Sequence, residues 1–260
     1  MRHLTLILAY LRHNLLSAMA YRGAFLLQVM GMVLNNSFFL FFWWVFFQRI
    51  PTLQGWGLSD VMILFGLVAF AFGIATAVFG NCLRIPRLVV TGQLDYYLTL
   101  PADPLVHLLV SRMSLSAWGD VLFGLGLFCV IHPLDPLRLL IFVSVGLLSA
   151  AVLVSFGVLS GSLVFWLGSM EQGAEQIIWS ITTFSMYPTE LFPPAIRVIL
   201  YTLIPAAFVG ALPARLVAQF SWDRLGLLLA FTVGFALLAR LVFYRGLRRY
   251  SSGNLVAMRG

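Results

Sequence analysis

Few residues in this sequence could take part in catalysis or bind a ligand, and the absence of lysine is as informative as the residues that are present. All 16 cationic side chains are arginines, because the sequence contains no lysine. A P-loop requires a lysine at the phosphates of its nucleotide, and Schiff-base catalysis requires a lysine amine. The chain is therefore not expected to bind and hydrolyse ATP by itself, so any ATP-driven step would need a second chain.

The histidines and cysteines do not form a recognisable site. His3, His13, His107 and His132 lack the spacing of metal ligands, and no Ser-His-Asp or Cys-His grouping is legible. Cys82 and Cys129 lie far apart and on opposite sides of the topology given below, so we expect no disulfide. These observations predict that the chain has no catalytic residues, no metal and no cofactor of its own.

Asp120 is the most unusual ionisable residue, because it falls inside an apolar run at about 113–131. A carboxylate within a membrane span is costly and usually faces protein or water. It could bind a cationic substrate, pair with Arg112 two helical turns earlier, or make a polar helix contact with nearby side chains at Ser114, Ser116 and Trp118. Glu171 and Glu175, spaced i, i+4, are expected to start a helix, where the dipole favours them.

The composition identifies the class of protein. Hydrophobic residues make up 61% of the chain, charged residues make up 10%, and the mean hydropathy is +0.98. Soluble domains average about 25% charged residues, so this chain could not cover a water-facing surface. The net charge of +7 comes from arginines between apolar runs, which is typical of topology determinants rather than of a nucleic-acid-binding face. We predict an all-α membrane protein surrounded by lipid.

The apolar pattern divides one transmembrane domain, 1–260, into successive elements. Residues 1–22 predict an amphipathic helix in the membrane interface, either an anchor or a coupling element. Residues 81–104 predict a cytoplasmic loop, and the proline-rich stretch 188–222 predicts a re-entrant helical hairpin on the external side. About six spans are expected, at 23–47, 61–79, 113–131, 139–167, 177–187 and 225–243.

The arginines predict the orientation of these spans. If both termini are cytoplasmic and 196–212 does not cross, eleven arginines lie in the cytoplasm and five lie outside. If 196–212 crossed fully, the arginine-rich tail would move outside and this bias would largely vanish. The excess of positive charge on the cytoplasmic side therefore favours both termini inside.

Within the cytoplasmic loop, residues 93–100 predict a short helix. Gly92 permits a turn at positive φ, Asp95 lies where a helix N-terminus favours negative charge, and Pro101 prevents continuation. Such a helix would present Leu94, Tyr97 and Leu98 on one face. That face could fill a groove in a soluble partner, or the helix could lie on the lipid surface.

Two stretches, together with the order of parts, resemble permeases of the type-2 ABC exporter superfamily. Thr91-Gly92-Gln93-Leu94-Asp95-Tyr96-Tyr97-Leu98-Thr99-Leu100-Pro101 resembles the loop between spans two and three of a bacterial branch with stand-alone permeases. The second stretch resembles that branch's proline-punctuated external segment, and consists of Met186-Tyr187-Pro188, Phe192-Pro193, Arg197, Ile204-Pro205, Ala207-Phe208 and Pro213.

This resemblance implies the partners and location of the protein. It implies a multi-pass protein of the bacterial inner membrane, paired with a second permease, identical or paralogous. Two copies of an ABC ATPase subunit would bind ATP and Mg, and no nucleic acid is implied. The residues implied to couple to the ATPase are Gly92, Gln93, Leu94, Asp95, Tyr97, Leu98 and Pro101.

The resemblance also implies export of an amphipathic small molecule, drug or lipid. Irregular backbone at membrane depth lines a cavity or is buried, so side chains beside the broken segment are candidates for the translocation pathway. These candidates are Phe184, Met186, Tyr187 and Phe192, with Asp120. An ion-coupled secondary transporter and a membrane assembly factor are the alternatives, although no second repeat provides a counterpart of Asp120.

Overall fold

The computed structural model describes residues 2–101, 103–133, 135–168 and 171–250, and its regular elements there are all helices. This confirms the predicted all-α class. Arg259, one of the eleven arginines predicted to be cytoplasmic, lies outside these ranges. The α-helices are α1 Arg2–Ala20, α2 Arg22–Phe47, α3 Leu58–Val78, α4 Ile85–Val90, α5 Leu94–Leu98, α6 Pro104–Val110, α7 Ala117–Ile131, α8 Pro136–Ser162, α9 Val164–Leu167, α10 Glu171–Ser185, α11 Pro194–Thr202, α12 Ala211–Ala218 and α13 Trp222–Leu247. Three 3₁₀ helices join them, namely η1 Gly80–Leu83, η2 Thr189–Leu191 and η3 Ala206–Phe208.

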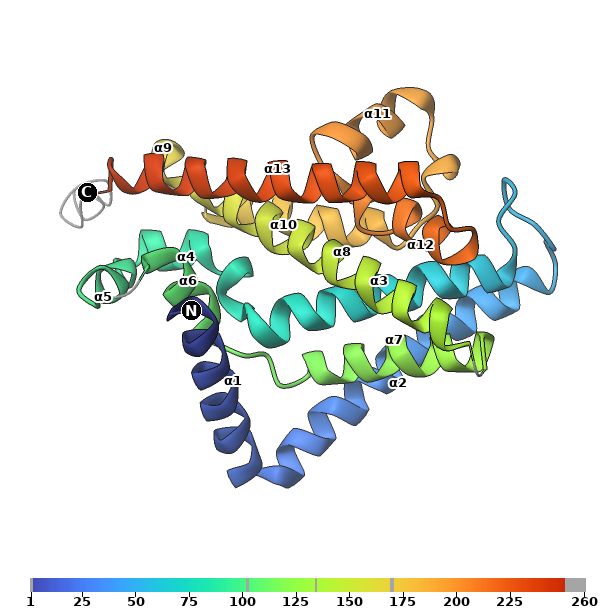
Figure 1. Cartoon of the computed structure of the whole chain (residues 1–260), viewed down its shortest axis with the longest axis horizontal. Helices are drawn as coiled ribbons and strands as arrows, with labels where there is room; N and C mark the ends of the chain where they lie inside the picture. Colours follow the sequence, from blue (N-terminus) through green and yellow to red (C-terminus); the bar gives the residue numbers. More distant parts are fainter. Residues whose placement is uncertain (1, 102, 134, 169–170, 251–260) are drawn as a thin grey trace.

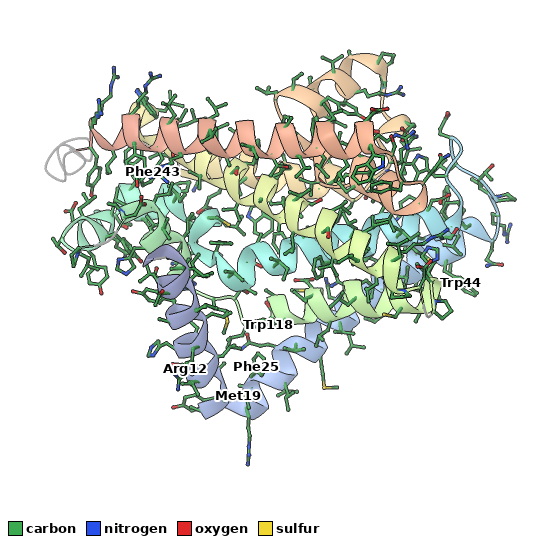
Figure 2. The ribbon with its side chains drawn as sticks, in the orientation of Figure 1. Arg12, Met19, Phe25, Trp44, Trp118 and Phe243 are labelled. Carbon is green, nitrogen blue, oxygen red and sulfur yellow. The ribbon has the colours of Figure 1, made fainter. Side chains whose placement is uncertain are left out.

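The long helices run along the long axis of the molecule, and the short helices gather near its ends (Figure 1). Helices α4, α5 and α6 lie at one end with the last turns of α13, whereas α11 and α12 lie in the opposite half (Figure 1). Helix α1 runs across the long axis beside α6 (Figure 1). Trp44 near the end of α2 and Phe243 near the end of α13 mark the opposite ends (Figure 2).

Four helices in the described part of the chain are long and apolar enough to cross a membrane. They are α2, α3, α8 with its continuation α9, and α13. Helices α7 and α10 have 15 residues each and rise only about 22 Å, less than the roughly 30 Å of a bilayer core. Two of the six predicted spans are therefore short.

The predicted break in the external segment is present. The helical stretches at 194–202 and 206–218 meet at an angle of 69°. Pro205 lies at this break, where its missing N–H and its ring prevent the first helix from continuing. The backbone of this segment is therefore bent in the way that its prolines predict.

Helix α3 is the centre of the bundle. In the most apolar 18-residue stretch of α3, 78% of the residues are buried, whereas the corresponding stretches of α2 and α13 are 11% and 22% buried. Glycines let α7 approach α3 closely: a Cβ on Gly73 would lie 2.8 Å from the carbonyl oxygen of Ala117, and a Cβ on Gly124 would collide with the carbonyl oxygen of Gly66. The α3–α7 contact therefore depends on positions without side chains.

Candidate functional site

A cavity of about 660 Å³ lies between α2, α3, α7, α10 and the segment that precedes α7. Four ionisable side chains line it, Arg84, Arg112, Asp120 and Glu175. Its apolar lining consists of Met32, Phe72, Leu83, Met113, Leu115 and Trp179. A cavity of this size, in which six apolar side chains lie next to eight polar or ionisable ones, can hold a small molecule.

Backbone hydrogen bonds hold the segment before α7 against the end of α3. The amide of Gly80 donates to the carbonyl oxygen of Arg112 at 3.0 Å, and the amide of Ser114 donates to that of Thr76 at 3.1 Å. A Cβ on Gly80 would lie 2.6 Å from the carbonyl oxygen of Arg112, so this approach requires glycine. The extended segment thereby carries Arg112 into the cavity wall.

Asp120 lies in the first turn of α7, not in the middle of a span. The predicted span began at about Met113, but α7 starts at Ala117 because the preceding residues pair with α3. The amide nitrogen of Asn36 donates to Oδ1 of Asp120 at 2.7 Å. A negative charge is favourable at this helix N-terminus.

The partners expected for Asp120 are not those observed. Arg112 lines the same cavity but forms no ion pair with Asp120. The hydroxyls of Ser114 and Ser116 lie 3.3 Å apart and contact each other instead. Oδ2 of Asp120 is buried and has no hydrogen-bond partner among the described residues. Nothing in the sequence pointed to Asn36, because it is 84 residues away from Asp120 and lies in an apolar helix.

The predicted loop at 81–104 and the residues that follow it form η1 and the three short helices α4, α5 and α6. Gly92 has φ of +73° and Asp95 lies in the first turn of α5, as predicted. The helix is shorter than the predicted 93–100, with Gln93 and Thr99 flanking it. Positive φ at Gly92 reverses the chain between α4 and α5.

The predicted docking face is wrong in part. Leu94 is fully buried against α4 and α6, and the hydroxyl of Tyr97 lies 2.9 Å from that of Ser111. These two side chains therefore hold the loop to its own chain. The exposed side chains around α5 include Leu98, Gln93, Pro101 and, unexpectedly, Tyr96, which is 62% exposed.

Polar contacts connect this loop to the ends of the long helices. Asp103 caps α6 by accepting from the amide of Val106 at 3.1 Å. The same carboxylate accepts from the hydroxyl of Tyr244 at 2.6 Å and from Arg240 at 3.1 Å, both on α13. On the other side of the loop, the hydroxyl of Tyr10 in α1 contacts the ring of the buried His107 in α6. Burial lowers the pKa of His107.

The remaining pathway candidates lie apart from Asp120, beside the broken segment. The rings of Phe184 and Phe192 pack edge to face with centroids 5.6 Å apart. Tyr187 packs against Trp43 of α2 at 6.1 Å, and Met186 packs against the cluster around Phe65. These four side chains are partly buried in aromatic packing, and none of them lines the 660 Å³ cavity.

Sequence reasoning missed a polar cluster around Glu190, beside the broken segment. The indole nitrogen of Trp56 donates to Glu190 at 2.8 Å, and Arg215 forms an ion pair with Glu190 at 2.5 Å. Arg215 also lies over the ring of Trp56, and Arg197 donates to the backbone of Glu190 at 3.2 Å. The only sequence signal was the presence of charges between the prolines of this segment.

Comparison with known proteins identifies the family. Residues 33–253 match the profile of the family described as ABC-2 family transporter protein. Comparison with curated proteins and with solved structures gave no significant match. Permeases of this family are membrane components without an ATPase domain of their own. Because the match covers most of the chain, including all of α3, α8 with α9, and α13 and the second half of α2, this protein belongs to the ABC-2 transporter family and is a multi-pass transmembrane permease.

Proposed function

We propose that this chain is the permease of an ABC exporter that moves an amphipathic small molecule, drug or lipid out of the cell. Two copies of a separate ATPase subunit would bind ATP and Mg, and a second permease, identical or paralogous, would complete the transport unit. Family membership carries this proposal. The cytoplasmic loop supports it, because contacts with α1 and α13 connect the loop to the membrane helices.

We propose the inner membrane as the location, with six spans and both termini cytoplasmic. Helices α2, α3, α7, α8 with α9, α10 and α13 would cross, and α11 with α12 would enter from outside and return. The 69° bend supports this arrangement, as does the position of α11 and α12 in the half of the molecule away from α4–α6 (Figure 1). The short α7 is extended towards the cytoplasmic end by the segment paired to α3.

The ATPase would dock on the exposed side of α5. Tyr96 and Leu98 supply exposed apolar surface there, whereas the buried Leu94 anchors α5 in the protein. A force on α5 would reach α6 through the packing between them, α13 through Asp103, and α1 through His107. The loop thus offers a path from a soluble partner to membrane helices.

The test is co-expression with an ABC ATPase subunit, sought first in the adjacent reading frames. Tyr96→Ala combined with Leu98→Ala should weaken co-purification or uncouple ATP hydrolysis from transport, because truncated interface anchors can cost about 2 kcal/mol or more. Leu203→Ala, which removes an exposed leucine from the opposite half of the molecule, should have no effect. If the double variant associates, hydrolyses ATP and transports normally, the ATPase does not dock on this face of α5.

A second candidate is an ion-coupled transporter, and the buried, unpartnered Oδ2 of Asp120 favours it. The two functions differ in their energy source. In vesicles, an ionophore would abolish ion-coupled transport, whereas ATP-driven transport would persist and would stop when the ATPase subunit is omitted.

A further inference from the structure

The 660 Å³ cavity contains polar groups that its own protein leaves without partners. Asp120 lines the cavity, and its Oδ2 is buried and lacks a hydrogen-bond partner in the described part of the chain. A buried carboxylate oxygen without a donor costs free energy, and an ammonium N–H is the donor that satisfies it best. Asn36 fixes the carboxylate by donating to its other oxygen at 2.7 Å, so Oδ2 is the oxygen that is left without a donor.

The cavity also contains two arginines that form no ion pair with its carboxylates. Arg84 and Arg112 both line it, and neither forms an ion pair among the residues that the structure describes. Burial, followed by the nearby charges of Arg112 and Arg87, lowers the pKa of Arg84, although an arginine remains protonated. Two guanidinium groups of this kind are suited to a phosphate or carboxylate.

Apolar and aromatic surface lies next to these charged groups. The ring centroids of Phe72 and Trp179 lie 5.9 Å apart in the cavity wall, and Trp179 is 48% exposed. An apolar chain can occupy this side while a polar head lies among the ionisable groups. The formal charges of Arg84, Arg112, Asp120 and Glu175 sum to zero. The cavity therefore does not favour a head group that carries charge of one sign only.

We propose that this cavity binds a zwitterionic amphipath, whose protonated amine donates to Asp120 and whose acidic group binds Arg84 and Arg112. The site would be a substrate site within one permease subunit, an assignment that rests on the proposed export function. The ligand is defined by three parts, which are an N–H-bearing ammonium, an anionic group and an apolar chain. Removing any one part should weaken binding.

The test is titration of the purified chain in a maltoside detergent, with bound ligand measured by native mass spectrometry. The probes are lauroyl lysophosphatidylethanolamine, lauroyl lysophosphatidylcholine, lauroyl lysophosphatidic acid and dodecylamine. The ethanolamine lipid should bind about tenfold or more tightly than the other three, because the choline lacks an N–H, the phosphatidic acid lacks an amine and the amine lacks an acid. Equal binding of all four, or equal binding of dodecylamine and the ethanolamine lipid, would overturn the proposal.

Substitutions then separate the two halves of the head site. Asp120→Asn should reduce the affinity for the ethanolamine lipid to that for lysophosphatidic acid, whereas Arg112→Gln should weaken binding of all three phospholipids and not of dodecylamine. Asp223→Asn, an exposed carboxylate at the start of α13, is the matched control and should change nothing. An ethanolamine preference that persists in Asp120→Asn contradicts the assignment.

This experiment is independent of folding losses and of the export assignment. If Asp120→Asn does not fold, the four-probe comparison on the unaltered chain and on Arg112→Gln still decides the outcome. Because no ATPase and no transport are involved, selective binding would stand even if export failed. Conversely, absence of selectivity would remove the cavity assignment and leave ATP-driven export to be judged by its own assay.

Discussion

Arg240 in α13 and Asp103 before α6 are 137 residues apart in the chain, and their side chains form an ion pair of 3.1 Å. The arginine is more than half exposed, so the pair itself contributes at most about 1 kcal/mol. The same carboxylate accepts a 2.6 Å hydrogen bond from Tyr244 and caps α6. Asp103 therefore joins the segment of short helices α4–α6 to α13 through several contacts at once.

Removing the Tyr244 hydroxyl should loosen this junction without unfolding the protein. Tyr244→Phe deletes a hydrogen bond to a charged group, which contributes about 1.5–3 kcal/mol. Hydrogen–deuterium exchange should then accelerate in 94–110 and stay unchanged in α3. Tyr21→Phe, which alters an exposed tyrosine at the start of α2, is the control and should leave both regions unaffected. Unchanged exchange in 94–110 would mean that Tyr244 does not hold the loop.

Cysteine labelling should place the loop and the broken segment on opposite sides of the membrane. Cys82 and Cys129 are both free thiols, so a Cys82→Ala, Cys129→Ser background removes them. In intact cells, an impermeant reagent should label Leu203→Cys and spare Thr99→Cys, and permeabilisation should expose the latter. Labelling of Thr99→Cys from outside would reverse the orientation, and protection of Leu203→Cys until permeabilisation would contradict a hairpin that returns to the outside.

The sequence predicted the class and most of the helices, because apolar length and proline position act locally. The end of α2 at Phe47, the positive φ at Gly92 and the break at Pro205 each follow from residues near the feature itself. Family membership was also predictable, since it was carried by the 91–101 stretch and the proline pattern.

Contacts between distant segments could not be predicted in the same way. Leu94 and Leu98 both lie on an amphipathic helix, and only the packing of α4 and α6 decides that Leu94 is buried while Leu98 is exposed. Asp120 was conspicuous as a charge in an apolar run, but its partner Asn36 and its position in the first turn of α7 depend on tertiary contacts. Periodicity identifies a face and does not say what covers it.

The α3–α7 contact should be intolerant of a single methyl group at one glycine and tolerant at another. A Cβ on Gly124 would collide with the carbonyl oxygen of Gly66 and lie 2.8 Å from Cβ of Phe70. Gly124→Ala should therefore lower the free energy of unfolding by about 1–3 kcal/mol, as overpacking does. Gly126→Ala is the matched control on the same helix, because its Cβ would meet nothing within 4 Å. Thermal unfolding in detergent measures both, and equal midpoints for the two variants would contradict the close approach.

The contact between α1 and α6 should weaken in mild acid. Burial lowers the pKa of His107 below its ordinary value of 6.5, so the folded protein binds fewer protons than the unfolded chain. The free energy of unfolding should then be constant above about pH 6.5 and fall as the pH drops from there towards the lowered pKa. The rings of Tyr10, Tyr96 and Tyr97 surround the imidazole, and burial raises the pKa of Tyr10 above its ordinary value.

This pH response can be measured as the difference in unfolding midpoint between about pH 7.5 and about pH 5.5, a window that spans the ordinary histidine pKa. The unaltered protein should lose stability at the lower pH, and His107→Gln should lose less, because it has no imidazole to protonate. His132→Gln removes a histidine at the end of α7 that shares no contact with α1, and it should keep the response of the unaltered protein. If His107→Gln and the unaltered protein lose the same stability, protonation of another group causes the loss and the α1–α6 contact is not sensitive to pH.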